Sequence, residues 1–178
     1  KLRLARPGVV IDLGRIPTMS YIREENGGLA IGAMTKYVDL ETSTLVKGRV
    51  EALSEAAGMV ADPQVRNMGT LGGNLAHADP ASDLTAVALA LGAQLVTSTT
   101  GSHRTISADD FFVDLFTTAL QPNEILSEIL IPALPARTGT AYDKMGNKAS
   151  HFAIVGVAAR VTLGEDGVCR DARVGVTG

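Results

Sequence analysis

The chain of 178 residues contains a single cysteine, Cys169. One thiol cannot form a disulfide within the chain, and an iron–sulfur cluster needs about four thiolates. Any such cluster would therefore belong to a partner chain. A composition without disulfides, and a start at Lys1 without a secretory leader, favour the cytoplasm. Membrane association through partner chains is the alternative.

Basic runs and long apolar runs are also missing. The net charge is −3, and no aromatic residues alternate with basic ones, so we expect no binding to nucleic acid. No apolar stretch reaches the about 18 residues that a transmembrane helix needs. The longest, residues 84–91, indicates a buried helix. His103 and His151 lack neighbours with the spacing of metal ligands, so we expect no metal site.

Two nucleotide-binding motifs are absent as well. No G-x-G-x-x-G follows a predicted strand, and no Gly-Lys-Ser/Thr follows the glycines near residue 70. A Rossmann site and a P-loop are therefore not supported. A phosphate held by backbone amides alone stays open.

Turn residues and β-branched runs predict more strands than helices. Strands are expected at 9–13, 21–25, 29–33, 94–99, 103–106, 124–131, 140–145 and 172–176, with Asn26-Gly27 joining one hairpin. Helices are expected after Thr35, at 45–57 ending at Gly58, from 83 to 91, and after Ser107. Residues 152–163 fit either a helix or a strand. Because hairpins dominate and no βαβ alternation occurs, we predict an α+β fold with a mixed or antiparallel sheet and flanking helices.

The most informative segment is residues 66–83, which read Arg-Asn-Met-Gly-Thr-Leu-Gly-Gly-Asn-Leu-Ala-His-Ala-Asp-Pro-Ala-Ser-Asp. Glycines let a backbone approach a bulky ligand, and exposed amides can cradle a phosphate. The glycines alone also fit a tight turn between strands. Asp83 fits a helix N-cap, and Arg66 fits either a cation at an interface or cofactor, or a solvated side chain.

This segment resembles the second flavin-binding loop of the FAD subunits of molybdenum hydroxylases, the family of aerobic carbon monoxide dehydrogenase and xanthine dehydrogenase. Two further stretches extend the resemblance, Asn123-Glu124-Ile125-Leu126 and Tyr142-Asp143-Lys144 followed by Phe152. It implies a PCMH-type FAD-binding fold. The positions that match the family's cofactor contacts are Thr70, Leu71, Gly72, Gly73, Asn74, His77, Asp83, Leu126, Lys144 and Phe152. An ordinary core or surface role remains the alternative for Leu126, Lys144 and Phe152, the last of which stands where some relatives have a tyrosine.

The resemblance further implies an electron-transfer function with no catalytic acid or base in this chain. A large molybdenum subunit and a small iron–sulfur subunit would be its partners, in a dimer of heterotrimers. The FAD would pass electrons to a quinone, NAD or O2. The style of the loop favours carbon monoxide as the substrate of the complex. A xanthine dehydrogenase-type subunit, a self-contained PCMH-type flavoenzyme and a non-catalytic assembly module are the alternatives.

The resemblance also divides the chain. Residues 1–136 match the FAD-binding domain, and residues 137–178 match the end of the FAD site and the start of a C-terminal flavoprotein domain. The family's first flavin loop, which has an Ala-Gly-Gly pattern, has no counterpart here. We therefore expect the sequence to be a fragment that holds one wall of the site.

Overall fold

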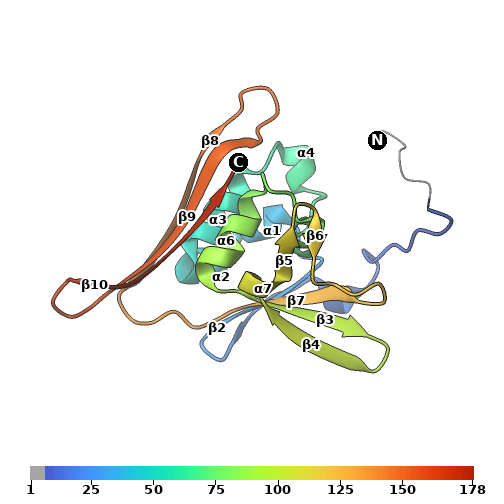
Figure 1. The fold of residues 1–178 in the computed structure, drawn as a ribbon, viewed down its shortest axis with the longest axis horizontal. Coiled ribbons are helices and arrows are strands. Elements are labelled where there is room, and N and C mark those ends of the chain that lie inside the picture. The colour runs from blue at the N-terminus through green and yellow to red at the C-terminus, as the bar shows by residue number, and fades with distance from the viewer. Residues whose placement is uncertain (1–6) are drawn as a thin grey trace.

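Two larger antiparallel sheets with a layer of helices between them, and a small two-stranded sheet of β5 and β6, make up the computed structural model, which describes residues 7–178 (Figure 1). The strands are β1 (Ile22–Glu25), β2 (Gly28–Gly32), β3 (Gln94–Thr99), β4 (Ser102–Ser107), β5 (Phe112–Asp114), β6 (Thr117–Thr118), β7 (Ile125–Ile131), β8 (Thr138–Gly146), β9 (Ala153–Leu163) and β10 (Cys169–Thr177). The helices are η1 (Pro17–Met19, a 3-10 turn), α1 (Tyr37–Thr42), α2 (Thr44–Arg49), α3 (Glu51–Met59), α4 (Pro63–Arg66), α5 (Leu71–His77), α6 (Asp83–Leu91) and α7 (Ala108–Phe111). The predicted α+β class is confirmed.

The larger sheet has five strands in the order β1-β2-β7-β3-β4. The β1–β2 hairpin turns at Asn26 and Gly27, whose φ angles of 49° and 80° lie in the left-handed region that Asn and Gly tolerate. The predicted hairpin of β3 and β4 is also present. Every residue of β2 is buried, because this strand lies between two neighbours and beneath the helices.

The smaller sheet has three strands in the order β10-β9-β8. Helix α6 packs against β9 and β10, and α3 packs against β8. Residues 152–163, which fitted either a helix or a strand, are mostly strand β9. Along β9, Val155 and Val157 are exposed, whereas Gly156 and Ala158, which alternate with them, are buried. This alternation is the two-residue period of a strand.

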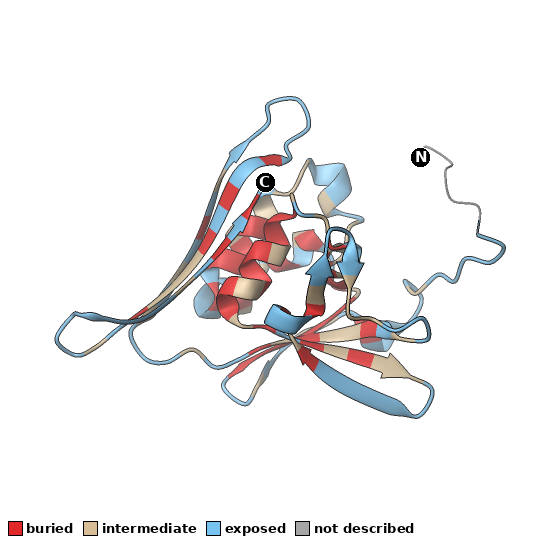
Figure 2. Cartoon of the chain, in the orientation of Figure 1, coloured by how far each residue is buried: buried red, intermediate tan, exposed pale blue. Residues whose placement is uncertain are grey.

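Helix α6 has the boundaries that its sequence predicts. Gly92 ends it in the left-handed conformation, as predicted, but its N-cap is Ser82, so Asp83 is the first helical residue and not the N-cap. Most of its residues are buried, as Figure 2 shows for the central helices. It therefore joins the two sheets into one core.

Residues 9–13 were predicted to be a strand, and this prediction is wrong. Val9, Val10 and Ile11 are 78–81% exposed and have no partner strand within residues 7–178. A β-branched run signals propensity only, whereas a strand also needs a neighbour for its hydrogen bonds.

Two helix boundaries also differ from the prediction. Thr35 does not cap a helix, because its hydroxyl bonds the backbone of Tyr21, and α1 begins two residues later. The single helix expected over 45–57 is two helices, broken at Val50, where ψ is 74°. Gly58 lies inside α3 and does not end it.

Candidate functional site

The glycine-rich segment forms the first turn of a helix. Thr70 is the N-cap of α5, and its hydroxyl accepts a hydrogen bond from the Gly73 amide (3.2 Å). The Leu71 and Gly72 amides donate to carbonyls of the chain that follows β2, at 2.9 and 2.8 Å. The predicted cradle of free amides is therefore wrong for residues 71–73, since the fold itself uses them.

The two adjacent glycines have different surroundings. A Cβ at Gly72 would overlap Ala33, so this glycine allows α5 to approach the end of β2 closely. Gly73 is exposed, and a Cβ there would meet only the Thr70 hydroxyl, at 2.8 Å. Of the pair, only Gly73 is exposed.

A hollow of about 310 Å³ lies beside this helix. Its walls come from α1, the turn between α3 and α4, the end of α5, the start of α6 and the turn between β8 and β9. Four of the predicted contact residues line it, and they are Asn74, His77, Asp83 and Phe152. Segments far apart in the sequence thus converge on one cavity.

One wall of the cavity is polar and ordered by hydrogen bonds. The Ser82 hydroxyl donates to the Asn74 Oδ1 at 2.5 Å, so the amide orientation of Asn74 is fixed. Tyr37 is buried beside it, and burial raises the pKa of the Tyr37 hydroxyl, an effect that a hydrogen bond from Asn74 opposes. Sequence analysis missed Tyr37, because a lone tyrosine in a short helix carries no motif.

Asp83, which lines the cavity, belongs to a buried ion pair that extends behind its wall. The Lys144 Nζ donates to Asp83 Oδ2 at 2.8 Å, and both side chains are only 7% exposed. The Tyr142 hydroxyl donates to Asp83 Oδ1 at 2.5 Å. Burial first, and the hydrogen bond to Asp83 second, raise the pKa of Tyr142, so this hydroxyl stays protonated at physiological pH. The surface role considered for Lys144 is excluded.

The open side of the cavity carries rings. The His77 side chain is 65% exposed, its ring centroid lies 5.2 Å from that of Phe116, and its Nε2 lies 3.9 Å from Asp79. Phe152 is half-exposed on the β8–β9 turn. A planar ligand entering here would meet aromatic and polar groups together.

Other predicted contact residues do not line this cavity. Leu71 and Leu126 belong to the hydrophobic core. Thr70, Gly72 and Gly73 lie one turn earlier on α5, and Lys144 lines a neighbouring hollow together with His151. The structure therefore brings four of the ten residues into one cavity and leaves the rest around it or beneath it.

Arg66 is not the solvated side chain that one of its two predicted roles required, because its side chain is only 17% exposed. Its Nε donates to Glu41 at 2.9 Å and its Nη1 to the Val60 carbonyl at 3.2 Å. Val60 and Ala61 line the cavity, and Ala61 has a φ of 43°. Arg66 thus stabilises the turn that forms this wall.

The residues present fit the ring system of a flavin. The cavity combines an aromatic ring, a fixed amide and the Asp83 carboxylate, whose ion-pair partner Lys144 lines the adjoining hollow, and these groups suit a planar heterocycle with hydrogen-bonding edges. A second hollow of about 190 Å³, between the β1–β2 turn and the start of β8, contains none of the predicted residues. Within residues 7–178 no group of three or more His, Cys, Asp or Glu side chains could hold a metal ion. No helix in the same range is long and apolar enough to span a membrane.

Known proteins share both this sequence and this architecture. The chain is 44% identical over 158 residues to the carbon monoxide dehydrogenase medium chain of Hydrogenophaga pseudoflava. This match covers 89% of this chain and 55% of the relative. It is 39% identical over 176 residues to subunit alpha of the 6-hydroxypseudooxynicotine dehydrogenase complex of Paenarthrobacter nicotinovorans, over 99% of this chain and 60% of that one. The chain thus spans somewhat over half the length of these relatives.

A solved structure agrees closely. Carbon monoxide dehydrogenase from Hydrogenophaga pseudoflava, in a form that lacks the Mo-pyranopterin moiety of its cofactor, superposes with a TM-score of 0.94 at 42% identity, over 99% of this chain and 61% of that one. Residues 1–134 match the family described as the FAD binding domain in molybdopterin dehydrogenase. The chain belongs to this family of FAD-binding domains.

Proposed function

We propose that this chain is the FAD-carrying part of the medium subunit of a molybdenum hydroxylase of the carbon monoxide dehydrogenase type. The observation that carries the proposal is the convergence of Asn74, Asp83 and Phe152 on one cavity, in a fold that matches a carbon monoxide dehydrogenase with a TM-score of 0.94. Membership of the FAD-binding family supports the choice of cofactor.

Ten residues are proposed to form the cofactor site. They are Thr70, Leu71, Gly72, Gly73, Asn74, His77, Asp83, Leu126, Lys144 and Phe152. Gly73 is supported by its exposed position on α5, and Asn74 is supported by its place in the lining of the cavity. Leu71, Gly72 and Leu126 would act through packing, because all three are buried.

When bound, FAD takes up electrons from one-electron carriers and gives them to a terminal acceptor, and the chain's residues bind and orient it. Phe152 would cover a ring face, and Asn74 would hydrogen-bond a polar edge through its amide. Lys144 would supply positive charge beside a group that becomes more negative on reduction. No residue of this chain needs to act as a catalytic acid or base.

The proposed partners are a large molybdenum subunit and a small iron–sulfur subunit, arranged as a dimer of heterotrimers. Relatives named as medium chains or subunits of complexes support partners of this kind. A quinone, NAD or O2 would be the acceptor, and the single thiol at Cys169 supports a cytoplasmic location. A domain boundary near residue 136 is supported by the loop that joins β7 of the five-stranded sheet to β8.

The proposed substrate of the complex follows from the relatives of the chain. Carbon monoxide is favoured by the 44% identity to a carbon monoxide dehydrogenase medium chain. An N-heterocyclic substrate is the second candidate, because a relative aligned over 99% of this chain belongs to a 6-hydroxypseudooxynicotine dehydrogenase.

The first test is a visible absorption spectrum of the natively purified protein, with the co-purifying chains identified. We expect flavin absorbance, iron–sulfur absorbance and a large molybdenum subunit, and reduction of the complex by carbon monoxide. If only N-heterocycles reduced the complex, an N-heterocycle would replace carbon monoxide as the proposed substrate. Flavin without partner chains would indicate a self-contained flavoenzyme, and a complex without flavin would indicate an assembly module.

A glycine substitution tests the site itself. Gly73→Val should abolish flavin retention in the purified complex, because a branched side chain would fill the space beside Thr70 and Asn74. The matched control is Gly48→Val, since nothing lies within 4 Å of a Cβ there. Normal flavin content in Gly73→Val would refute the assignment of this helix start to the cofactor.

A further inference from the structure

A network of buried groups connects α6 to β8 and β9 beside the cavity. Asp83 accepts from the Tyr142 hydroxyl at one oxygen (2.5 Å) and from Lys144 Nζ at the other (2.8 Å). The Lys144 Nζ also donates to the His151 carbonyl at 2.9 Å. Hydrogen bonds thereby link Tyr142 to Asp83, Asp83 to Lys144, and Lys144 to the His151 carbonyl.

The position of Tyr142 is fixed from several sides. Only 2% of Tyr142 is exposed, and its backbone amide donates to Glu55 of α3 at 2.8 Å. Across the sheet, a Cβ at Gly156 would overlap the Tyr142 hydroxyl. The strand pairing places Gly156 directly opposite Lys144, so the same glycine leaves room for the hydroxyl that reaches Asp83.

The Lys144 ammonium lies between two hollows. Asp83 lines the cavity proposed for the flavin, Lys144 lines the adjoining hollow, and His151 lines both. An ammonium has three N–H donors, and here two of them are used by Asp83 and His151. The third is available to a ligand, with a direction that the other two determine.

The negative charge of Asp83 partly offsets the positive charge of Lys144. A carboxylate that accepts a hydrogen bond from a neutral hydroxyl has part of its charge stabilised locally, in a site where burial strengthens each interaction. The Tyr142 hydroxyl is such a donor and stays protonated. It therefore limits how far Asp83 offsets the ammonium and keeps the carboxylate from rotating.

We propose that Tyr142 is a positioning residue, which acts through Asp83 to hold the Lys144 ammonium beside the flavin and so raises the reduction potential of the flavin. This inference rests on the proposed function. All three tyrosines lie within residues 7–178, and among them Tyr142 is the one whose hydroxyl hydrogen-bonds the ion pair. Tyr21 donates to Glu128 in the five-stranded sheet, outside the cavity, and offers a matched control.

The experiment measures the flavin reduction potential and the flavin content of the purified complex in the wild type and in Tyr142→Phe, Lys144→Met and Tyr21→Phe. We expect Lys144→Met to lower the potential most and Tyr142→Phe to lower it less, with flavin retained. Tyr21→Phe should match the wild type. A purely structural role of Tyr142 would reduce flavin content without moving the potential of the flavin that remains.

The outcomes separate the two proposals. If the wild-type complex contains no flavin, the proposed function fails. If it contains flavin and Tyr142→Phe has the wild-type potential, only the positioning role is overturned. If Tyr142→Phe does not assemble, Lys144→Met decides the matter, because an unchanged potential in that variant would overturn the inference.

Discussion

The two sheets lie against the same helical layer but use different residues to do so. The five-stranded sheet contributes large side chains to the core, among them Leu29, Ile31, Leu95 and Ile129. Apart from Tyr142, the three-stranded sheet turns mainly small residues inward, and at Gly175 a Cβ would overlap the Ala86 carbonyl of α6. The first contact is stabilised by buried volume and the second depends on close backbone approach. The two regions should therefore fail in opposite ways, one when a residue is made smaller and the other when a residue is made larger.

The largest effect is expected in the five-stranded sheet. Leu95→Ala should lower the free energy of unfolding by about 3 kcal/mol, because Leu95 is fully buried and its loss leaves a cavity among the core residues. Chemical denaturation of the purified chain measures this. A change below about 1 kcal/mol would mean that the core collapses around the gap.

A smaller loss is expected from enlarging the other contact. Gly175→Val should cost about 2 kcal/mol, since the added side chain would push β10 away from α6. Gly139→Val on β8 is the control, because nothing lies within 4 Å of a Cβ there. Equal midpoints for the two variants would contradict the close approach of sheet and helix.

A pH series tests an arginine–carboxylate pair that links β4 of the five-stranded sheet to the segment before β7. Glu124 accepts from Arg104 at 2.6 and 2.7 Å, and this lowers the pKa of Glu124 to about 2 from its ordinary value near 4.3. A lowered carboxylate pKa stabilises the folded state above the ordinary pKa, and the contribution is lost as the pH falls through the folded value. Arg104→Gln should therefore be less stable than the wild type above about pH 4.3, and the difference should shrink toward pH 2.

Denaturation midpoints at pH 7, 4 and 2.5 check this expectation. Arg23→Gln is the control, because Arg23 lies on β1 and contacts Glu25 and Glu128, not Glu124. A difference that grows as the pH falls would contradict the assignment.

The smallest effect is expected on the outer face of the three-stranded sheet. Val176 is 66% exposed, and Figure 2 shows this face as exposed along β9 and β10. Val176→Thr should change the stability of the chain by less than about 0.5 kcal/mol. A larger loss would show that this face is covered in solution, for instance by a second copy, and dilution of the sample would then lower the midpoint.

Local signals predicted many of the elements. The Asn26-Gly27 turn, the hairpin of β3 and β4, and helix α6 between Ser82 and Gly92 all lie where the sequence predicts them. Each is set by contacts within a few residues, namely a left-handed turn or a helix cap.

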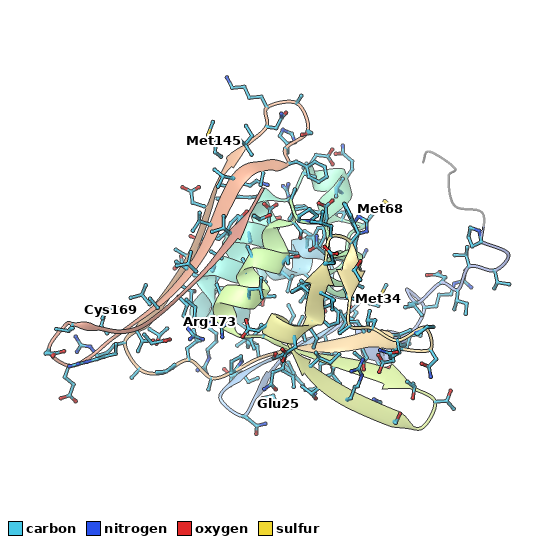
Figure 3. The ribbon with its side chains drawn as sticks, in the orientation of Figure 1. Glu25, Met34, Met68, Met145, Cys169 and Arg173 are labelled. Atoms are coloured by element: carbon cyan, nitrogen blue, oxygen red, sulfur yellow. The ribbon has the colours of Figure 1, made fainter. Side chains whose placement is uncertain are left out.

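Cys169 could be assigned no function from the sequence, and it lies at the end of the β9–β10 hairpin, well away from Met145 (Figure 3).

Sequence motifs identified the candidate site but not its construction. The segment 70–74 was expected to expose its amides, yet Thr35 and Ala33 accept hydrogen bonds from two of them. Arg66 was expected either as a cation at an interface or cofactor or as a solvated side chain, and the structure shows that it stabilises a cavity wall. A motif names residue types, whereas the partners of each group come from segments that are distant in the chain.

By itself, the sequence determined the fold class, the turns, the glycine that ends α6 and the family to which the chain belongs. Those features depend on residue type and on spacing over a few positions. Only the tertiary structure decided that residues 9–13 lack a partner strand and that most of 152–163 is a strand. It alone also joined Asp83 with Tyr142 and Lys144, about 60 residues away. Strand pairing and buried ion pairs need two distant segments to meet, and no local pattern encodes which segments those are.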